Sequence, residues 1–245
     1  MNDNIKITRS EDFNLFLKSP HIDRYYYYFN KLIQKMLGND KITIRQVVTE
    51  QDFSDLSKAR IRMYGQRDDY LSSMYRNGNT IDDRDLSAYV FACYLDGEII
   101  GSQRLTPQKF EVKQYIDNEA LVAFLGVDYN EHYVEFSRLV ADKNSGVKGV
   151  ANALVMVSAA IVILTTKYNR LISYSRPKVD MQIKAFSIDN EIIRFNIKER
   201  NNNEYILYKK DMLDQCRIFF GMKNIKRKDV LATLHEKTIE NILVI

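Results

Sequence analysis

Residues 134–140 carry a glutamate and an arginine three positions apart, Glu135 and Arg138, among apolar neighbours. Such a run is typical of a buried strand. A glutamate there can take a proton from an attacking amine, and desolvation would raise its pKa toward the working range. Residues 146–151 then place glycines before a long apolar helix, and the backbone N–H groups at a helix start bind phosphate. The two stretches together predict acyl transfer from a phosphate-bearing carrier.

The elements that must position these residues can be read from periodicity. Residues 42–48 alternate as a strand does, and Thr49 with Asp52 predicts a capped helix that runs to about residue 64. Asp96-Gly97 lies between two β-rich runs and predicts a hairpin. The other predicted elements are helices over 113–126, 149–167 and 178–187 and from 211, and strands over 171–174, 191–198 and 204–209.

Composition narrows the class of protein. The chain has 245 residues, of which 45% are hydrophobic and 28% charged, with a formal net charge of +4. These values are ordinary for a globular protein, and the charge is too small to indicate a nucleic-acid binder. Two cysteines and three histidines lack metal-ligand spacing, so we expect no metal site. The polar start predicts no signal peptide, and the apolar run over 150–164 is too short to span a membrane, so we expect a cytoplasmic protein.

The domain organisation is expected to be simple. Residues 1–40 contain clustered aromatic and aliphatic residues and end in a helix-stop signal, Gly38-Asn39-Asp40, which predicts an N-terminal helical extension. Residues 41–245 show neither an internal repeat nor a low-complexity linker. We therefore expect them to form a single α/β domain, a central mixed sheet flanked by helices, with a C-terminal elaboration.

The order of the predicted elements resembles the acyltransferases of the GNAT superfamily. That family holds a pyrophosphate on a loop of pattern Arg/Gln-x-x-Gly-x-Gly/Ala at a helix N-terminus. Gly149 and Ala151 match the second half of the pattern, whereas Gly146 stands in the position of the Arg or Gln. The resemblance thus implies that Gly146, Gly149 and Ala151 bind the acyl carrier. The departure at Gly146 favours a carrier held mainly by its phosphopantetheine arm.

Four spaced motifs narrow the resemblance to the LuxI-type acyl-homoserine-lactone synthases and the related N-acyl amino acid synthases. The motifs are an arginine with regularly spaced aromatic and basic residues, two carboxylates three apart, Gly-x-x-Arg-Leu before a proline, and Glu-x-Ser-Arg before an apolar residue. Tyrosine stands where the family has Phe and Trp in the first motif. The matching residues are Arg60, Tyr64, Arg67 and Tyr70; Asp82 and Asp85; Gly101, Arg104, Leu105 and Pro107; and Glu135, Ser137, Arg138 and Leu139.

The resemblance implies a fatty acyl group taken from acyl carrier protein, or from acyl-CoA, as co-substrate rather than from a permanently bound cofactor. The acceptor would be the amino group of an amino acid or of S-adenosylmethionine, and the product an N-acyl amino acid or an acyl-homoserine lactone used as a signal or lipid. Glu135, Arg138 and Arg104 would be catalytic. Arg60, Asp82 and Asp85 would complete a buried charged network that binds the acceptor.

Two alternatives remain open at this stage. One is an ordinary acetyl-CoA-dependent N-acetyltransferase, which a complete phosphate-loop pattern would favour. The other is a catalytically degenerate fold that serves as a binding module, which loss of the acid–base residue would favour. The basic run that includes Lys226, Arg227 and Lys228 would suit an acidic acyl carrier protein, although such runs are usually solvated surface.

Overall fold

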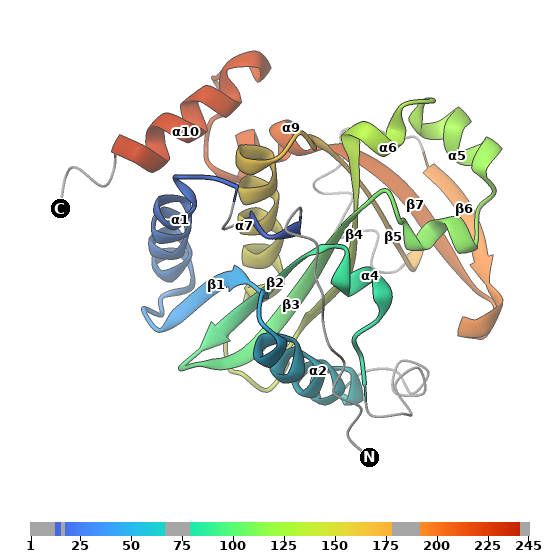
Figure 1. Cartoon of the computed structure of the whole chain (residues 1–245), viewed down its shortest axis with the longest axis horizontal. Coiled ribbons are helices and arrows are strands. Elements are labelled where there is room, and N and C mark those ends of the chain that lie inside the picture. The colour runs from blue at the N-terminus through green and yellow to red at the C-terminus, as the bar shows by residue number, and fades with distance from the viewer. Residues whose placement is uncertain (1–12, 16–17, 67–78, 178–191, 241–245) are drawn as a thin grey trace. The chain divides into compact units, whose positions relative to one another are not determined.

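The computed structural model describes residues 13–15, 18–66, 79–177 and 192–240 (Figure 1). The chain divides into two compact units. The first unit comprises residues 1–104 and 138–157, and the second comprises residues 105–137 and 158–245. The strands form one seven-stranded sheet in the order β1-β2-β3-β4-β5-β7-β6. One pairing, β4 with β5, is parallel, whereas β1–β2, β5–β7 and β6–β7 are antiparallel. The expected mixed α/β sheet is therefore confirmed.

The first unit begins with elements whose ends were signalled in the sequence. Helix α1 (Ile22–Leu37) stops at Gly38, which adopts the left-handed backbone conformation that glycine tolerates. Strand β1 (Ile42–Gln46) follows, and helix α2 (Glu50–Gly65) starts with a complete capping box between Thr49 and Asp52. The predicted strand and capped helix are both confirmed.

The predicted hairpin joins β2 (Tyr89–Leu95) to β3 (Glu98–Pro107). Asp96 and Gly97 both have positive φ, 50° and 85°, which is the backbone that a tight two-residue hairpin turn requires. Strand β2 also pairs antiparallel with β1, from Ile42–Leu95 to Gln46–Phe91. These strands give the first unit a twisted platform on which its helices pack.

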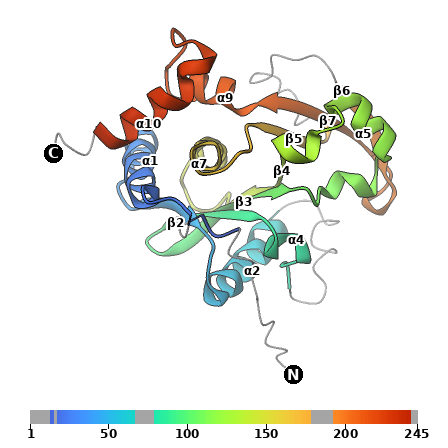
Figure 2. The ribbon, with the colours of Figure 1, turned by 45° about the horizontal axis from the view of Figure 1, so that its top comes forward.

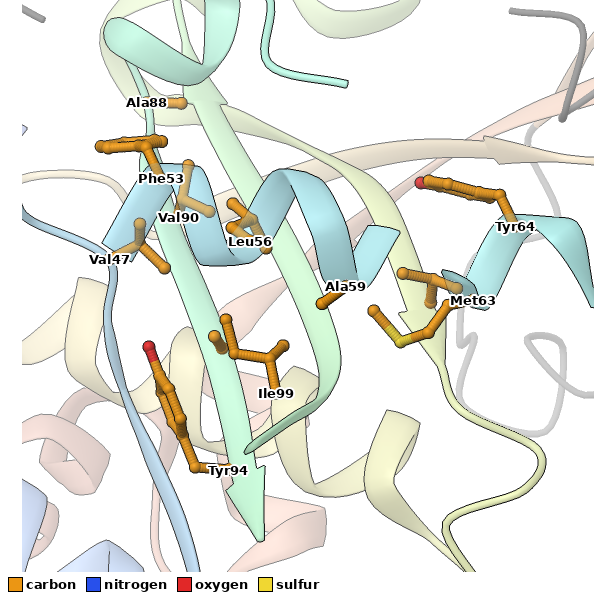
Figure 3. Close-up of a cluster of buried hydrophobic side chains, with 12 residues drawn as sticks. Val47, Phe53, Leu56, Ala59, Met63, Tyr64, Ala88, Val90, Tyr94 and Ile99 are labelled. Atoms are coloured by element: carbon orange, nitrogen blue, oxygen red, sulfur yellow. The ribbon is translucent and has the colours of Figure 1, made fainter. Parts of the chain in front are cut away.

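An apolar cluster fixes α2 onto this platform (Figure 3). Phe53, Leu56 and Met63 point from α2 toward Val90 of β2 and Ile99 of β3, and all five are buried. The α2 positions are spaced three or seven apart, so they lie on one face of the helix. Arg60 follows Leu56 by four residues, so its buried side chain lies on the same face of α2, where it joins a group of charged residues.

Helix α7 (Val150–Thr165) confirms the predicted apolar helix and is seen almost end-on in Figure 2. Its first turns belong to the first unit and approach β3 closely at Gly101. A β-carbon at Gly101 would lie 2.7 Å from Val150 Cγ1 and 3.1 Å from the Val140 carbonyl oxygen. Glycine is therefore required here by close packing, which explains the glycine of the Gly-x-x-Arg-Leu motif.

The second unit contains the parallel pairing of β4 (Tyr133–Ala141) with β5 (Arg170–Ser175), which runs from Tyr133–Arg170 to Phe136–Ser173. Strand β5 pairs in turn with β7, and β7 with β6, so the strands predicted near 191–198 and 204–209 are confirmed. Its remaining elements are η3 (Glu111–Gln114), α5 (Asn118–Leu125), α6 (Tyr129–His132), β6 (Ile192–Ile197), η4 (Lys198–Arg200), β7 (Asn203–Asp211), α9 (Met212–Phe219), η5 (Arg227–Asp229) and α10 (Val230–Glu240).

Two details of the second unit differ from the sequence prediction. The helix expected over 113–126 is split into η3 and α5, because Asp117 caps a new helix by accepting a hydrogen bond from the Ala120 N–H. Helix α10 was not predicted, although Val230, Leu234 and Thr238 recur every four residues and are buried. The helix expected over 178–187 lies outside the described residues.

An apolar cluster that includes Phe110, Leu121, Tyr133, Ile172 and Leu207 forms the core of this unit.

Candidate acyl-transfer site

Five predicted site residues meet in the first unit as one charged network. Arg60 of α2 donates from Nη1 to Asp85 Oδ2 at 2.9 Å. Arg104 of β3 donates from Nη1 to Asp82 Oδ1 at 2.7 Å, and Arg138 of β4 donates from Nη2 to Asp82 Oδ2 at 3.1 Å. A further ion pair at 3.7 Å joins Arg104 Nη1 to Asp85 Oδ2. The structure thus brings together residues that lie up to 78 positions apart (138 − 60).

The spacing of the two acids has a local cause that the sequence analysis missed. Asp82 caps the one-turn helix α4 (Asp83–Leu86), accepting hydrogen bonds from the N–H groups of Arg84 and Asp85. Asp85 returns the contact by accepting from the Asp82 N–H at 3.1 Å. This is a capping box, and an Asp-x-x-Asp pattern was its available signal. The box holds both carboxylates rigidly, so that each presents its remaining lone pairs to the arginines.

Burial divides the network into an inner part and an accessible part. The side chains of Arg60, Asp85 and Arg104 are all 0% exposed, whereas those of Asp82 and Arg138 are 31% and 13% exposed. A dissolved molecule can therefore touch Asp82 and Arg138 directly. The other three residues act on it only by holding these two in place.

The network favours the ionised form of the Asp82 carboxyl. Burial would raise the pKa of the Asp82 carboxyl, but the charges of Arg104 and Arg138 outweigh it and lower that pKa to about 2. Three arginines and two aspartates give the network a net charge of +1 (3 − 2). Arg60 makes further contacts at 3.4 Å with Ser102 Oγ and the Thr80 carbonyl oxygen.

Arg138 has an unusual backbone. Its φ is +54°, in the left-handed region that residues other than glycine seldom adopt, and it lies within strand β4. Backbone strain of this kind is retained where surrounding contacts fix it, and it occurs often at functional sites. Here the ion pair with Asp82 is one of those contacts.

The glycines expected to bind the carrier lie at the start of α7. Gly146 and Gly149 have φ of 73° and 87°, and Ala151 is the second residue of the helix. A β-carbon at Gly149 would lie 3.0 Å from Leu37 Cδ2. Backbone N–H groups at such a helix start suit a phosphate. Their role in binding the acyl carrier stays a prediction.

A polar clamp that was not predicted joins α2 to the loop before these glycines. Arg62, left unassigned by the sequence analysis, donates from Nε to Asp142 Oδ2 at 3.2 Å and from Nη2 to the Ile99 carbonyl oxygen at 2.6 Å. Gln66 donates to Asp142 Oδ1 at 3.1 Å. The residues Arg67 and Tyr70 of the first motif lie outside the described residues.

Glu135 lies on β4 in the second unit. Its side chain is fully buried, and Oε2 accepts a hydrogen bond from the Val112 N–H at 3.0 Å. Burial and the negative charges of Glu111 and Glu135 raise the pKa of Tyr174 well above its ordinary value. Glu135 is therefore buried close enough to Tyr174 for its charge to change the pKa of that tyrosine.

The described residues show neither a metal site nor a membrane-spanning helix. They contain no group of three His, Cys, Asp or Glu side chains placed to hold a metal ion. Within the same ranges, no helix combines the length and the apolar character needed to cross a membrane.

Comparison with known proteins supports the fold. No protein-family model and no curated protein matches the sequence. A CoA-dependent acyl-homoserine lactone synthase, BjaI, solved with SAM and isopentyl-CoA, matches with a TM-score of 0.51 and 14% identity over 81% of this chain and 89% of that chain.

Two further solved structures match at a similar level. FeeM, an N-acyl amino acid synthase from uncultured soil microbes, matches with a TM-score of 0.50 and 14% identity over 71% of this chain and 92% of its own. A GNAT-family acetyltransferase from Streptococcus pneumoniae matches with a TM-score of 0.50 and 13% identity over 69% and 98% of the two chains. The sheet order, the helices and these similarities together show that the chain has the GNAT acyltransferase fold.

Proposed function

We propose that the protein is an N-acyltransferase that moves a fatty acyl group from acyl carrier protein or acyl-CoA to the amino group of an amino-acid-type acceptor. The product would be an N-acyl amino acid or, with S-adenosylmethionine as acceptor, an acyl-homoserine lactone. The observation that carries the proposal is the charged network, because four separate elements supply its residues at the motif positions.

The accessible end of the network suits a zwitterionic acceptor. Asp82 offers a carboxylate to an ammonium group, and Arg138 offers a guanidinium to a carboxylate. Asp82 Oδ2 and Arg138 Nη2 lie 3.1 Å apart, so these two side chains can hold the ammonium and the carboxylate of one amino acid. The net charge of +1 favours the carboxylate end and disfavours a plain alkyl amine.

Glu135 would serve as the general base. Because its side chain has no exposed surface, we infer that the amine proton reaches it through a water molecule. The amine nitrogen then forms a bond to the thioester carbon, the carbon–sulfur bond breaks, and the thiolate leaves on the carrier. The glycines at the start of α7 would hold the carrier phosphate through backbone N–H groups.

The names of two similar structures agree with this reaction class. FeeM is an N-acyl amino acid synthase, and BjaI is an acyl-homoserine lactone synthase that depends on CoA. These names support the choice of acyl donor and acceptor to be tested. They do not favour one product over the other for this chain.

The deciding experiment combines purified protein with acyl-CoA or acyl-carrier-protein donors of several lengths and with amino acids or S-adenosylmethionine, followed by mass spectrometry. An acylated amino acid or lactone is expected. Turnover confined to acetyl-CoA would identify an acetyltransferase instead, and no turnover with any pair would favour a binding module.

Two sets of variants test the assigned residues. Glu135→Gln should lose most turnover, by about 10²–10⁴-fold, while the control Glu131→Gln, an exposed glutamate of α6, keeps it. Lys226→Glu with Lys228→Glu should lower turnover with acyl carrier protein relative to turnover with acyl-CoA. Arg227 is left unchanged because it pairs with Asp211. If Glu135→Gln keeps the turnover of the wild type, Glu135 is not the general base.

A further inference from the structure

A buried ion pair connects the β6–β7 hairpin to η3 in the second unit. Arg200, the last residue of η4, donates from Nη2 to Glu111 Oε1 at 3.0 Å. Only 12% of the Arg200 side chain and 6% of the Glu111 side chain are exposed. The turn that follows keeps Arg200 in place, because Asn203 donates from Nδ2 to the Arg200 carbonyl oxygen at 2.6 Å.

The same glutamate adjoins the group that binds Glu135. The N–H that donates to Glu135 Oε2 at 3.0 Å belongs to the peptide bond between Glu111 and Val112. Its nitrogen is two covalent bonds from the Glu111 α-carbon. Anything that fixes the backbone of Glu111 therefore fixes the donor to Glu135. Arg200 binds the Glu111 carboxylate from a position 89 residues along the chain and so restrains the residue whose peptide bond carries this donor.

Three aromatic rings lie around the Arg200 guanidinium, and a fourth ring packs against them. The Arg200 guanidinium lies 5.9, 5.7 and 5.5 Å from the ring centres of Tyr115, Tyr174 and Tyr205. Phe195 contacts all three of these rings, with centroid distances from 5.6 to 6.1 Å. An arginine over aromatic faces gains a cation–π attraction, and the rings also exclude water. Charges inside the enclosure are therefore weakly screened.

We propose that Arg200 and Glu111 are positioning residues for Glu135, which they orient and whose charge state they balance. The inference rests on the proposed role of Glu135 as base. The pair acts through the Val112 N–H and through the charges themselves, and it touches no substrate.

The charge balance predicts opposite effects for the two partners. Glu111, Glu135, Arg200 and Tyr115 all act on the charge of Tyr174, and Tyr205 is hydrogen-bonded to Arg200. Removing the Arg200 charge leaves a second carboxylate near Glu135 without its cation, which disfavours ionised Glu135. Removing the Glu111 charge leaves the cation, which favours it.

The experiment compares R200Q, R200K, E111Q and the double variant R200Q/E111Q. Two readouts are used: the pH profile of kcat/KM and the carboxylate ¹³C titration of Glu135, assigned by its loss in E135Q. R200Q should raise the Glu135 pKa, and E111Q should lower it. The double variant should return close to wild type, and R200K should shift least.

A matched control is available on the same hairpin. Arg194 of β6 pairs with Glu204 at 3.1 Å, and both side chains are about half exposed. R194Q should leave the Glu135 titration unchanged. If R200Q does not fold, E111Q tests the same balance with Arg200 in place.

The outcomes separate this inference from the proposed function. Shifts of the Glu135 titration in the same direction for R200Q and E111Q, or no shifts, would overturn the positioning role. Shifts as expected in the ¹³C titration, with a kcat/KM profile that does not follow them, would support the pair and instead remove Glu135 as the base.

Discussion

Replacing Arg60 by methionine tests whether the inner charged network stabilises the first unit. Arg60 and Asp85 are both fully buried and are joined at 2.9 Å. Methionine keeps an unbranched apolar stem and removes the charged guanidinium, so that Asp85 loses its closest cation. Breaking a buried pair in this way costs about 3–5 kcal/mol, because the remaining charge stays desolvated. Arg104, at 3.7 Å from Asp85, offsets part of this cost and places the expectation near the lower value.

The lost free energy of unfolding should appear as a lower melting temperature, Tm. For a chain of this length, 1 kcal/mol corresponds to about 2–4 °C in Tm, so a loss of about 3 kcal/mol should lower the Tm of Arg60→Met by roughly 6–12 °C. Calorimetry gives Tm, and urea denaturation gives the free energy of unfolding. The control is Lys58→Met on the same helix, since the Lys58–Asp55 pair is largely exposed and should contribute under about 1 kcal/mol.

A double variant tests whether the lost stability comes from the Asp85 charge that Arg60→Met leaves without its closest cation. Arg60→Met combined with Asp85→Asn removes both charges, so it should be more stable than Arg60→Met alone. Two results would refute the reasoning. One is an Arg60→Met Tm no lower than that of Lys58→Met. The other is a double variant whose losses simply add, which would assign the effect to packing.

Two further predictions concern the same unit. The pKa of Asp82 is lowered to about 2 in the folded protein, so the stability that it provides is complete above about pH 4 and is lost as pH falls toward 2. Asp82→Asn should remove that acid sensitivity in urea midpoints measured across the window, and an unchanged slope would contradict it. Gly101→Ala should cost about 1–3 kcal/mol in urea denaturation through its 2.7 Å approach to Val150, whereas Gly65→Ala, with open space around it, should cost nothing. If the two variants are equally stable, α7 shifts to accommodate the added methyl group with no loss of free energy of unfolding.

Much of the fold was predictable because local signals agree with one another. Asp96-Gly97 requires a turn, and Thr49 with Asp52 satisfies a helix start whatever lies around it. The five members of the charged network could also be predicted, since motif spacing singled them out. Their division into inner and accessible residues could not, because burial depends on neighbours from other elements.

Other features have no local signal. The Glu111–Arg200 pair joins residues 89 apart, and nothing near either residue indicates the other. The positive φ of Arg138 contradicts the preference of arginine, so only tertiary contacts can impose it. The two acids of the network were interpreted by charge alone, and their second use as a helix cap was missed.

Because Asp82 serves both as an ion-pair partner and as a helix cap, its position in the network must be occupied by an acid. In many ion pairs the two signs can be exchanged, with the acid and the base trading places, and the attraction survives. Here Asp82 must also accept hydrogen bonds from two backbone N–H groups, and an arginine has no acceptor to offer them. Exchanging Asp82 with Arg104 would preserve the sum of charges and yet leave α4 without its cap. A designer who wishes to invert the charge of this acceptor site must therefore rebuild the helix start as well.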